Sequence, residues 1–155
     1  MNDKFEQNSC RRIYLQLIIG TAVVFASPSF GLTQTAQVDY AIAANYYTQE
    51  SWDEAIDSFG QLILKYPGSE ESVTARFFIA EILMKQEEYQ SAFRAYQNFI
   101  QEHPNNAYRS RAVFRLGESA YRLSHYDVAI RSLEDFILNH PQNDLNKYAL
   151  KNLAK

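Results

Sequence analysis

The sequence predicts an all-α protein built as an array of stacked helical hairpins. Prolines recur every 37 residues, at Pro67, Pro104 and Pro141. A self-similar period of this length is typical of helical repeats, in which each unit is too small to bury its own apolar face and needs its neighbours. The same interval separates an aromatic residue, an alanine and a pair of large apolar residues in each unit: Trp52, Tyr89 and Tyr126; Ala55, Ala92 and Ala129; Leu62-Ile63, Phe99-Ile100 and Phe136-Ile137.

Composition agrees with one foldable domain that follows a short leader. Of the 155 residues, 46% are hydrophobic, and only 5 Gly and 4 Pro are present, which argues against disorder. The formal net charge of -3 provides no basic surface for nucleic acid, so we expect no nucleic-acid partner. Cys10 is the only cysteine and cannot form an internal disulfide, so cysteine usage does not indicate the redox compartment.

Residues 1–31 have the layout of a secretory signal peptide. The polar stretch Met1–Arg12 precedes the largely apolar stretch Ile13–Phe25, and a run of small and turn-forming residues follows. Cleavage after Ala26 or after Gly31 fits this layout. A retained membrane anchor is the weaker alternative, because about 13 apolar residues are short for the ~20 needed to cross a bilayer. A buried N-terminal helix is weaker still. We expect membrane contact only through this segment, and only transiently.

Two variants of the export signal concern Cys10. The run Cys10-Arg11-Arg12 resembles the twin-arginine export motif, but paired arginines also precede the apolar core of ordinary signals. The export route therefore stays open. A lipoprotein signal would place its cysteine at the end of the apolar run, whereas Cys10 precedes that run, so lipid anchoring is disfavoured.

The third unit shows the expected hairpin. Residues 112–121 fit a first helix, residues 123–125 a tight turn, and residues 126–137 a second helix whose apolar residues follow the i, i+3, i+4, i+7 pattern of one buried stripe. Gly117 and Ala129 fall where two helices approach closely, which requires small side chains. Each second helix should end just before its proline, which has no amide donor and disfavours helical geometry in the preceding residue.

These residues resemble the tetratricopeptide repeat family. The resemblance implies a right-handed α-solenoid of helix-turn-helix repeats over residues 38–155, with full repeats at about 38–74, 75–111 and 112–148 and the start of a fourth at 149–155. The period is 37 rather than 34, and alanine replaces the motif glycine in two units. An exported array with long units is similar to the bacterial envelope subgroup, which includes the periplasmic coordinator associated with the Tol-Pal system and the lipoprotein of the outer-membrane β-barrel assembly machine. The string that carries the resemblance is Leu116-Gly117-Glu118, followed by Tyr121, Tyr126, Ala129, Leu133 and Pro141.

The end of the chain matches the opening of a fourth first-helix. A shift of 37 aligns Ala149 with Ala112 and Leu153 with Leu116. Solenoids normally finish with a polar capping helix. We therefore expect the sequence to be a fragment of a longer protein, and the alternative is that residues 144–155 form a short cap.

No residue pattern points to catalysis. His103 and His140 directly precede prolines, where a ring near a helix C-terminus is favourable, and no second ligand lies at i+3 or i+4 to build a metal site. Neither a phosphate-binding loop nor a nucleophile with a partner is present. We therefore expect no catalytic residues, no metal, no cofactor and no small-molecule substrate.

A protein or peptide partner is the expected ligand. In the family that this chain resembles, first helices line a concave groove. Aromatic residues, Met and Arg are enriched at recognition surfaces. Tyr40, Phe77 and Phe114 can equally pack as ordinary core, whereas we expect Tyr47, Met84 and Tyr121 to be exposed. The resemblance places these residues in the groove: Tyr40, Tyr47, Phe77, Glu81, Met84, Arg111, Phe114, Glu118, Tyr121 and Arg122.

A cluster of arginines shares one helical face with Glu118. Arg111, Arg115 and Arg122 lie within about 40 degrees of one another at 100 degrees per residue. Spacings of three and four residues allow Glu118 to pair with Arg115 and Arg122 as a solubilising network. The alternative is a basic spot that binds a peptide carboxylate, with Glu118 orienting the guanidinium groups.

Together these features predict an exported, periplasmic or otherwise extracytoplasmic scaffold for protein–protein interaction in the bacterial envelope. One alternative is a helper repeat region of a larger exported enzyme or glycan-linked protein. Another is a cytosolic adaptor whose N-terminus only resembles a signal.

Overall fold

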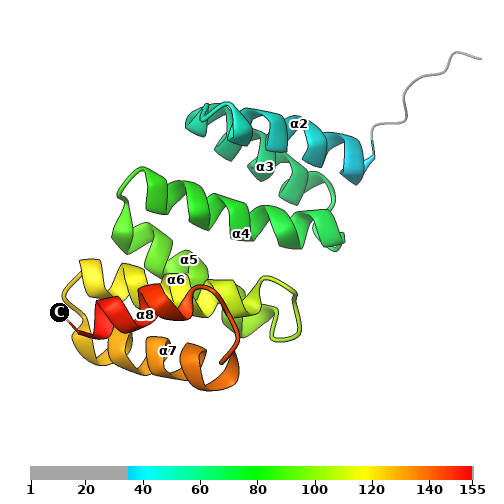
Figure 1. Cartoon of the computed structure of the whole chain (residues 1–155). Helices are drawn as coiled ribbons and strands as arrows, with labels where there is room; N and C mark the ends of the chain where they lie inside the picture. The colour runs from blue at the N-terminus through cyan, green and yellow to red at the C-terminus, as the bar shows by residue number, and fades with distance from the viewer. Residues whose placement is uncertain (1–34, 155) are drawn as a thin grey trace, which may run out of the picture. The chain divides into compact units, whose positions relative to one another are not determined.

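The computed structural model describes residues 35–154, which form α-helices joined by short turns and contain no strand (Figure 1). The segment expected to be a signal peptide lies outside the described residues. Within the described part, no helix combines the length and hydropathy that crossing a bilayer requires. The helices are α2 (Ala36–Thr48), α3 (Trp52–Lys65), α4 (Glu70–Lys85), α5 (Tyr89–Glu102), α6 (Arg109–Arg122), α7 (Tyr126–Asn139) and α8 (Asn146–Leu153).

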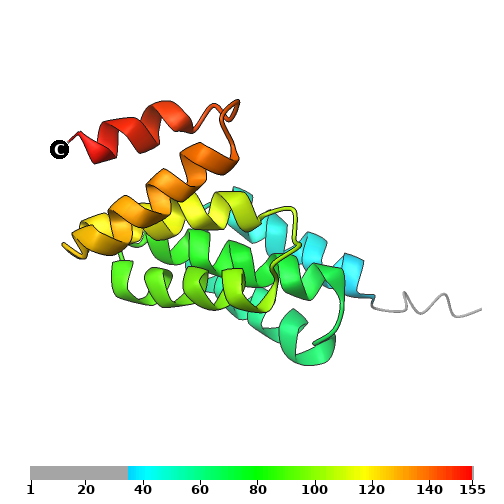
Figure 2. The same ribbon diagram turned by 90° about the horizontal axis from the view of Figure 1, so that it is seen from below.

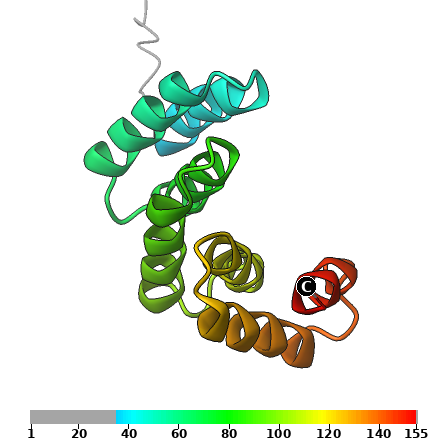
Figure 3. The same ribbon diagram turned by 90° about the vertical axis from the view of Figure 1, so that its left-hand side faces the viewer.

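Consecutive helices pair as hairpins, α2 with α3, α4 with α5 and α6 with α7, and each hairpin packs on the next. At the C-terminal end, α8 packs beside α7 and also contacts α6 (Figure 2). Viewed from the side, α6 and α8 lie on the inner side of a curve, and α5 and α7 lie on its outer side (Figure 3). The prediction of an all-helical solenoid of hairpins is confirmed.

The hairpins begin earlier than the predicted repeat ranges. The boundary after residue 74 falls inside α4, and the boundary after residue 111 falls inside α6. The second helices keep the 37-residue interval, but only four residues separate α3 from α4. The helix begins this early because the side-chain oxygen of Ser69 accepts a hydrogen bond from the backbone of Ser72 and caps it. Repeat boundaries drawn from the period alone therefore cut through helices.

The core consists of three clusters that follow the repeat. Tyr96 and Phe99 of α5 are buried with Phe77 of α4, and equivalent positions fill the clusters before and after. A Cβ atom built on Gly117 would lie 2.7 Å from Cγ of the buried Leu133, so the close helix approach expected at this glycine is confirmed. Ala129 is buried as expected. Small residues therefore set the distance between the paired helices.

The turn inside each hairpin contains one residue in the left-handed region. Glu50, Glu87 and Ser124 have φ values of 58°, 62° and 61° and lie 37 residues apart. Glycine is the residue that adopts this conformation most easily, and none of these three positions is a glycine, so the sequence predicted the turn at residues 123–125 but not the left-handed residue within it.

The second helix of each hairpin ends just before its proline, as predicted. Tyr66, His103 and His140 are the C-terminal caps of α3, α5 and α7, and a proline follows each of them. The two imidazole rings also pack on phenylalanines of their own helices, with ring centroids 5.3 Å apart for His103 and 5.4 Å for His140. The histidines thus have a packing role at helix ends.

Candidate protein-binding groove

A polar groove of about 530 Å³ lies where the C-terminal ends of α4 and α6 meet the start of α5 and the last turn of α8. Stacking brings these segments together, because α4 and α6 are the first helices of successive hairpins and α8 packs against α7 and α6. The groove is lined by Met84, Lys85, Glu87, Tyr89, Arg115, Glu118, Tyr121, Arg122 and Asn152.

Beside the groove, a buried carboxylate ties the second hairpin to the third. Glu81 on α4 is only 2% exposed. Its Oε1 atom accepts hydrogen bonds from the Tyr96 hydroxyl at 2.6 Å and from Arg115 Nε at 2.9 Å. Its Oε2 atom accepts from Arg111 Nη2 at 2.7 Å and from Arg115 Nη2 at 3.3 Å. Two guanidinium groups of α6 thus neutralise one carboxylate of α4.

Electrostatics explain why this charge is tolerated in the core. A buried carboxylate is costly unless it is paired and hydrogen-bonded, and Glu81 satisfies both conditions. Burial alone would lower the pKa of Arg115, but the charge of Glu81, together with Glu118, outweighs that effect and raises it. Burial raises the pKa of Tyr96 well above its usual value, and the nearby charge of Glu81 raises it further. Arg115 and Tyr96 therefore stay in one protonation state at physiological pH.

The arginine face is largely a paired network. Arg115 Nη1 donates a hydrogen bond to Glu118 Oε2 at 2.7 Å, which is one of the two pairs expected for Glu118. Among the described residues, Arg122 has no ion pair with Glu118 or any other carboxylate, and its guanidinium lies 5.4 Å from the centroid of the Tyr89 ring. Lys85 also has no ion pair within the described part of the chain. Arg122 and Lys85 are therefore the groove cations that are left for a ligand.

Three of the predicted groove residues are buried, and their assignment to the groove surface is corrected. Phe77 is fully buried and Phe114 is 2% exposed, because both rings fill the space between hairpins. Glu81 is enclosed by Tyr96 and the α6 arginines, so it holds those side chains in place instead of facing a partner.

Three others lie away from the groove. Tyr40 and Tyr47 are partly buried and pack against Phe78, with ring centroids at 6.3 Å and 5.1 Å. Burial raises the pKa of both hydroxyls. Arg111 is exposed, and its guanidinium group is held by Glu81. The structure brings four predicted residues together in the groove: Met84, Glu118, Tyr121 and Arg122.

Sequence reasoning missed the contributions of Glu87, Tyr89 and Asn152. Tyr89 begins α5 and was noted only as a repeat aromatic, and Asn152 belongs to α8. Asn152 is the repeat equivalent of Arg115, 37 residues earlier, and Arg115 also lines the groove. The 37-residue period could therefore have predicted the groove position of Asn152.

The described residues offer no cluster of His, Cys, Asp and Glu side chains suited to a metal ion. The groove chemistry is that of recognition, since it combines the two cations, an arginine–carboxylate pair, the carboxylate of Glu87 and half-buried apolar side chains.

Comparison with known proteins agrees with this architecture. The profile of the tetratricopeptide repeat family matches residues 111–143. The TPR domain of Arabidopsis OM64 superposes with a TM-score of 0.65 at 19% sequence identity, covering 77% of this chain and 93% of that one, which shows a shared fold. A search of curated proteins found no significant match.

Repeats of this kind serve as scaffolds for protein–protein interaction, and the families matched here are generally non-catalytic. The profile of YfiO, described as an outer membrane lipoprotein, matches residues 32–122, which is more than half of the chain. The chain therefore belongs to the YfiO family.

Proposed function

We propose that this protein is a non-catalytic scaffold of the bacterial cell envelope that binds a segment of another envelope protein in the groove between α4, α6 and α8. The observation that carries the proposal is the pair of cations, Lys85 and Arg122, that line the groove without an ion pair among the described residues. Charged groups placed beside apolar surface suit a peptide with acidic and apolar side chains.

The groove offers both parts of such a site. Met84, Tyr89 and Tyr121 are half-buried and supply apolar surface, and aromatic residues and arginine are frequent hot spots. The Glu81–Arg115 pair joins α4 to α6 and fixes the distance across the groove. A site that is formed before binding loses less conformational entropy when the partner arrives.

Two features support a place in the envelope. The family is described as outer membrane lipoprotein. Residues 1–31, which lie outside the described residues, have the layout of an export signal. Lipid attachment through Cys10 is not part of the proposal, because that residue precedes the apolar run.

Export is tested by mass spectrometry of the protein released by osmotic shock from a bacterial host. The expected mature form begins near Ser27 or Leu32. Recovery of the intact chain from the cytosol would favour the cytosolic adaptor. The alternative of a helper region in a larger enzyme is tested by reading the gene beyond Lys155, since a catalytic domain there would support it.

Groove binding is tested by affinity capture from envelope extract with variants that circular dichroism shows to be folded. A single site of this size should bind with a Kd of roughly 1 μM. Tyr121→Ala and Arg122→Ala should each weaken capture about tenfold or more if they are hot spots. Gln97→Ala and Arg131→Ala change exposed residues of second helices and should have almost no effect. The proposal is wrong if capture follows the outer changes and ignores the groove changes.

A further inference from the structure

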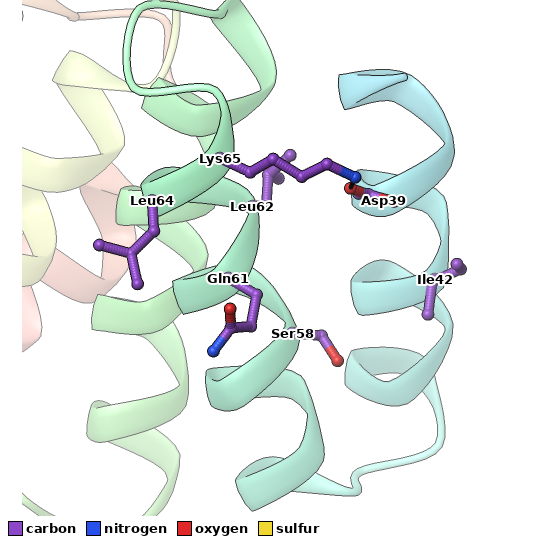
Figure 4. A pocket seen from close by; sticks show the side chains of 7 residues that line it. All are labelled: Asp39, Ile42, Ser58, Gln61, Leu62, Leu64 and Lys65. Carbon is purple, nitrogen blue, oxygen red and sulfur yellow. Dashed lines mark hydrogen bonds and ion pairs between the residues drawn. The ribbon is translucent and has the colours of Figure 1, made fainter. Parts of the chain in front are cut away.

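A second hollow lies on the N-terminal edge of the array, between α2 and α3, and measures about 520 Å³ (Figure 4). Ile42 lies on its α2 side, and Ser58 and Gln61 lie on its α3 side. Lys65 reaches from α3 towards Asp39 on α2, with 3.1 Å between Nζ and Oδ2. We call this hollow the edge groove; it is lined by Asp39, Ile42, Ser58, Gln61, Leu62, Leu64 and Lys65.

The same groove recurs one repeat later, where it is partly filled. Six of the seven lining positions of the edge groove, moved by 37 residues, line the hollow between α4 and α5, whose volume is about 220 Å³. The one additional lining residue there is Ile63, which comes from α3 of the preceding hairpin. Within the array, therefore, a groove of this kind receives an isoleucine from the second helix that precedes it.

Isoleucine recurs at this bridging position. Ile100, the equivalent of Ile63, packs against the second and the third core clusters and so joins two hairpins, and Ile137 packs against the third. Seven residues earlier on the same helix face, Ile56 packs against the first cluster, and its equivalent Phe93 contacts His125 of the following hairpin at 5.7 Å. The stacking stripe of a second helix is thus two apolar residues seven positions apart.

The outer face of α2 retains stacking residues. Val38 and Ile42 are 40% and 46% exposed, yet their repeat equivalents meet the preceding hairpin. Ala75, Ala112 and Ala149, the equivalents of Val38, are fully buried, and Ile79, Leu116 and Leu153, the equivalents of Ile42, are partly buried against the core clusters. Leu64 on the rim is 77% exposed.

One polar atom also points to an occupant. Oδ1 of Asp39 is buried and accepts no hydrogen bond from the described residues. A buried carboxylate oxygen without a donor is costly, so a lysine, arginine or amide from a docked helix would satisfy it.

We propose that the edge groove docks an amphipathic helix of another protein, which inserts an isoleucine or leucine in the register of Ile63, carries a second apolar residue seven positions earlier and supplies a donor to Asp39. A second copy of this chain is a poor occupant, because Ile63, Ile100 and Ile137 are already engaged in its own core clusters. The leader is a poor occupant because residues 1–31 are expected to be removed. This surface is separate from the groove between α4, α6 and α8.

The helix that fills the equivalent groove supplies the probe. A fluorescent peptide with the sequence of residues 51–66 is held helical by a hydrocarbon bridge that replaces the exposed Asp53 and Asp57, since a short isolated helix is marginal in water. Fluorescence anisotropy with the full chain should give a Kd on the order of 100 μM, as expected for a small interface. A probe carrying Ile63→Ser should bind at least tenfold more weakly.

Two protein variants locate the binding. Ile42→Glu puts a charge on the exposed face of α2 and should weaken probe binding at least tenfold while the circular dichroism spectrum stays unchanged. Arg122→Ala should leave probe binding unchanged. No detectable binding, or binding that Ile42→Glu does not change, overturns the proposal. A dimer of the parent protein that Ile42→Glu dissociates would also overturn it, because the occupant is then a second copy. Probe binding that occurs only after residues 1–34 are cleaved off would overturn it too, because the leader is then the occupant.

Discussion

Replacing Glu81 by alanine should destabilise the protein more than any substitution of an exposed carboxylate. The change leaves the buried hydroxyl of Tyr96 without its acceptor, leaves Arg111 without its carboxylate partner and leaves Arg115 with Glu118 alone. Removal of one partner of a buried ion pair costs about 3–5 kcal/mol. Because Glu81 joins α4 to α6, the loss should affect the second and third hairpins together.

Urea unfolding of the full chain, followed by circular dichroism, measures this cost from the shift of the midpoint at constant m value. The matched control is Glu118→Ala, which removes an acceptor of Arg115 that is 22% exposed and should cost about 1 kcal/mol or less. Glu81→Gln keeps an acceptor oxygen and should fall between the two. A cost below about 1 kcal/mol for Glu81→Ala, or equal costs at the two positions, would refute the structural role of this carboxylate.

Three further outcomes are expected. Gly117→Ala should lower the free energy of unfolding by about 1–3 kcal/mol, because the new Cβ would lie 2.7 Å from Leu133 Cγ. Gly60→Ala, where a Cβ has nothing within 4 Å, should raise the free energy of unfolding by about 0.5–1 kcal/mol. Urea midpoints of the two variants that shift in the same direction from the parent would contradict this. Glu50→Gly should raise the melting temperature, corresponding to about 0.5–1 kcal/mol, because it relieves a φ of 58°, and a lower melting temperature would count against the strain. Tyr96 is neutral in the folded protein and its pKa is raised, so the stability that it contributes is present below pH ~10, where the unfolded tyrosine is also neutral, and is lost as the pH rises further. The urea midpoint should therefore depend less on pH between pH 9 and 11 in Tyr96→Phe than in the parent. Identical slopes in the two proteins would contradict the assignment.

The fold was predictable because its signals are local and repeated. Proline, alanine and aromatic residues at one period located the second helices, and Gly117 indicated a close helix approach. The starts of the first helices were not predictable from the period, since the loop after α3 is shorter than the loop after α5.

The candidate site was only partly predictable. The pairing of Arg115 with Glu118 follows from their spacing on one helix, but the burial of Glu81 depends on Arg111 and Arg115, which lie 30 and 34 residues further along the chain. Family resemblance wrongly placed Phe77 and Phe114 in the groove. It identifies which helices line the groove, but it does not say which side of each helix the neighbouring hairpins bury. The edge groove was not predictable from the sequence, because the period does not show that, among the described residues, the hairpin at the array's N-terminal edge lacks the isoleucine that fills the equivalent groove one repeat later.

Site-specific photo-crosslinking in cells tests the central claim most directly. A photoreactive phenylalanine analogue is placed at Met84 in the groove or at Gln97 on the exposed side of α5, and crosslinked partners are identified by mass spectrometry. The account predicts an adduct with an envelope protein from Met84 that Arg122→Ala reduces about tenfold. Adducts from Gln97 alone, or a Met84 adduct that Arg122→Ala leaves unchanged, would contradict it.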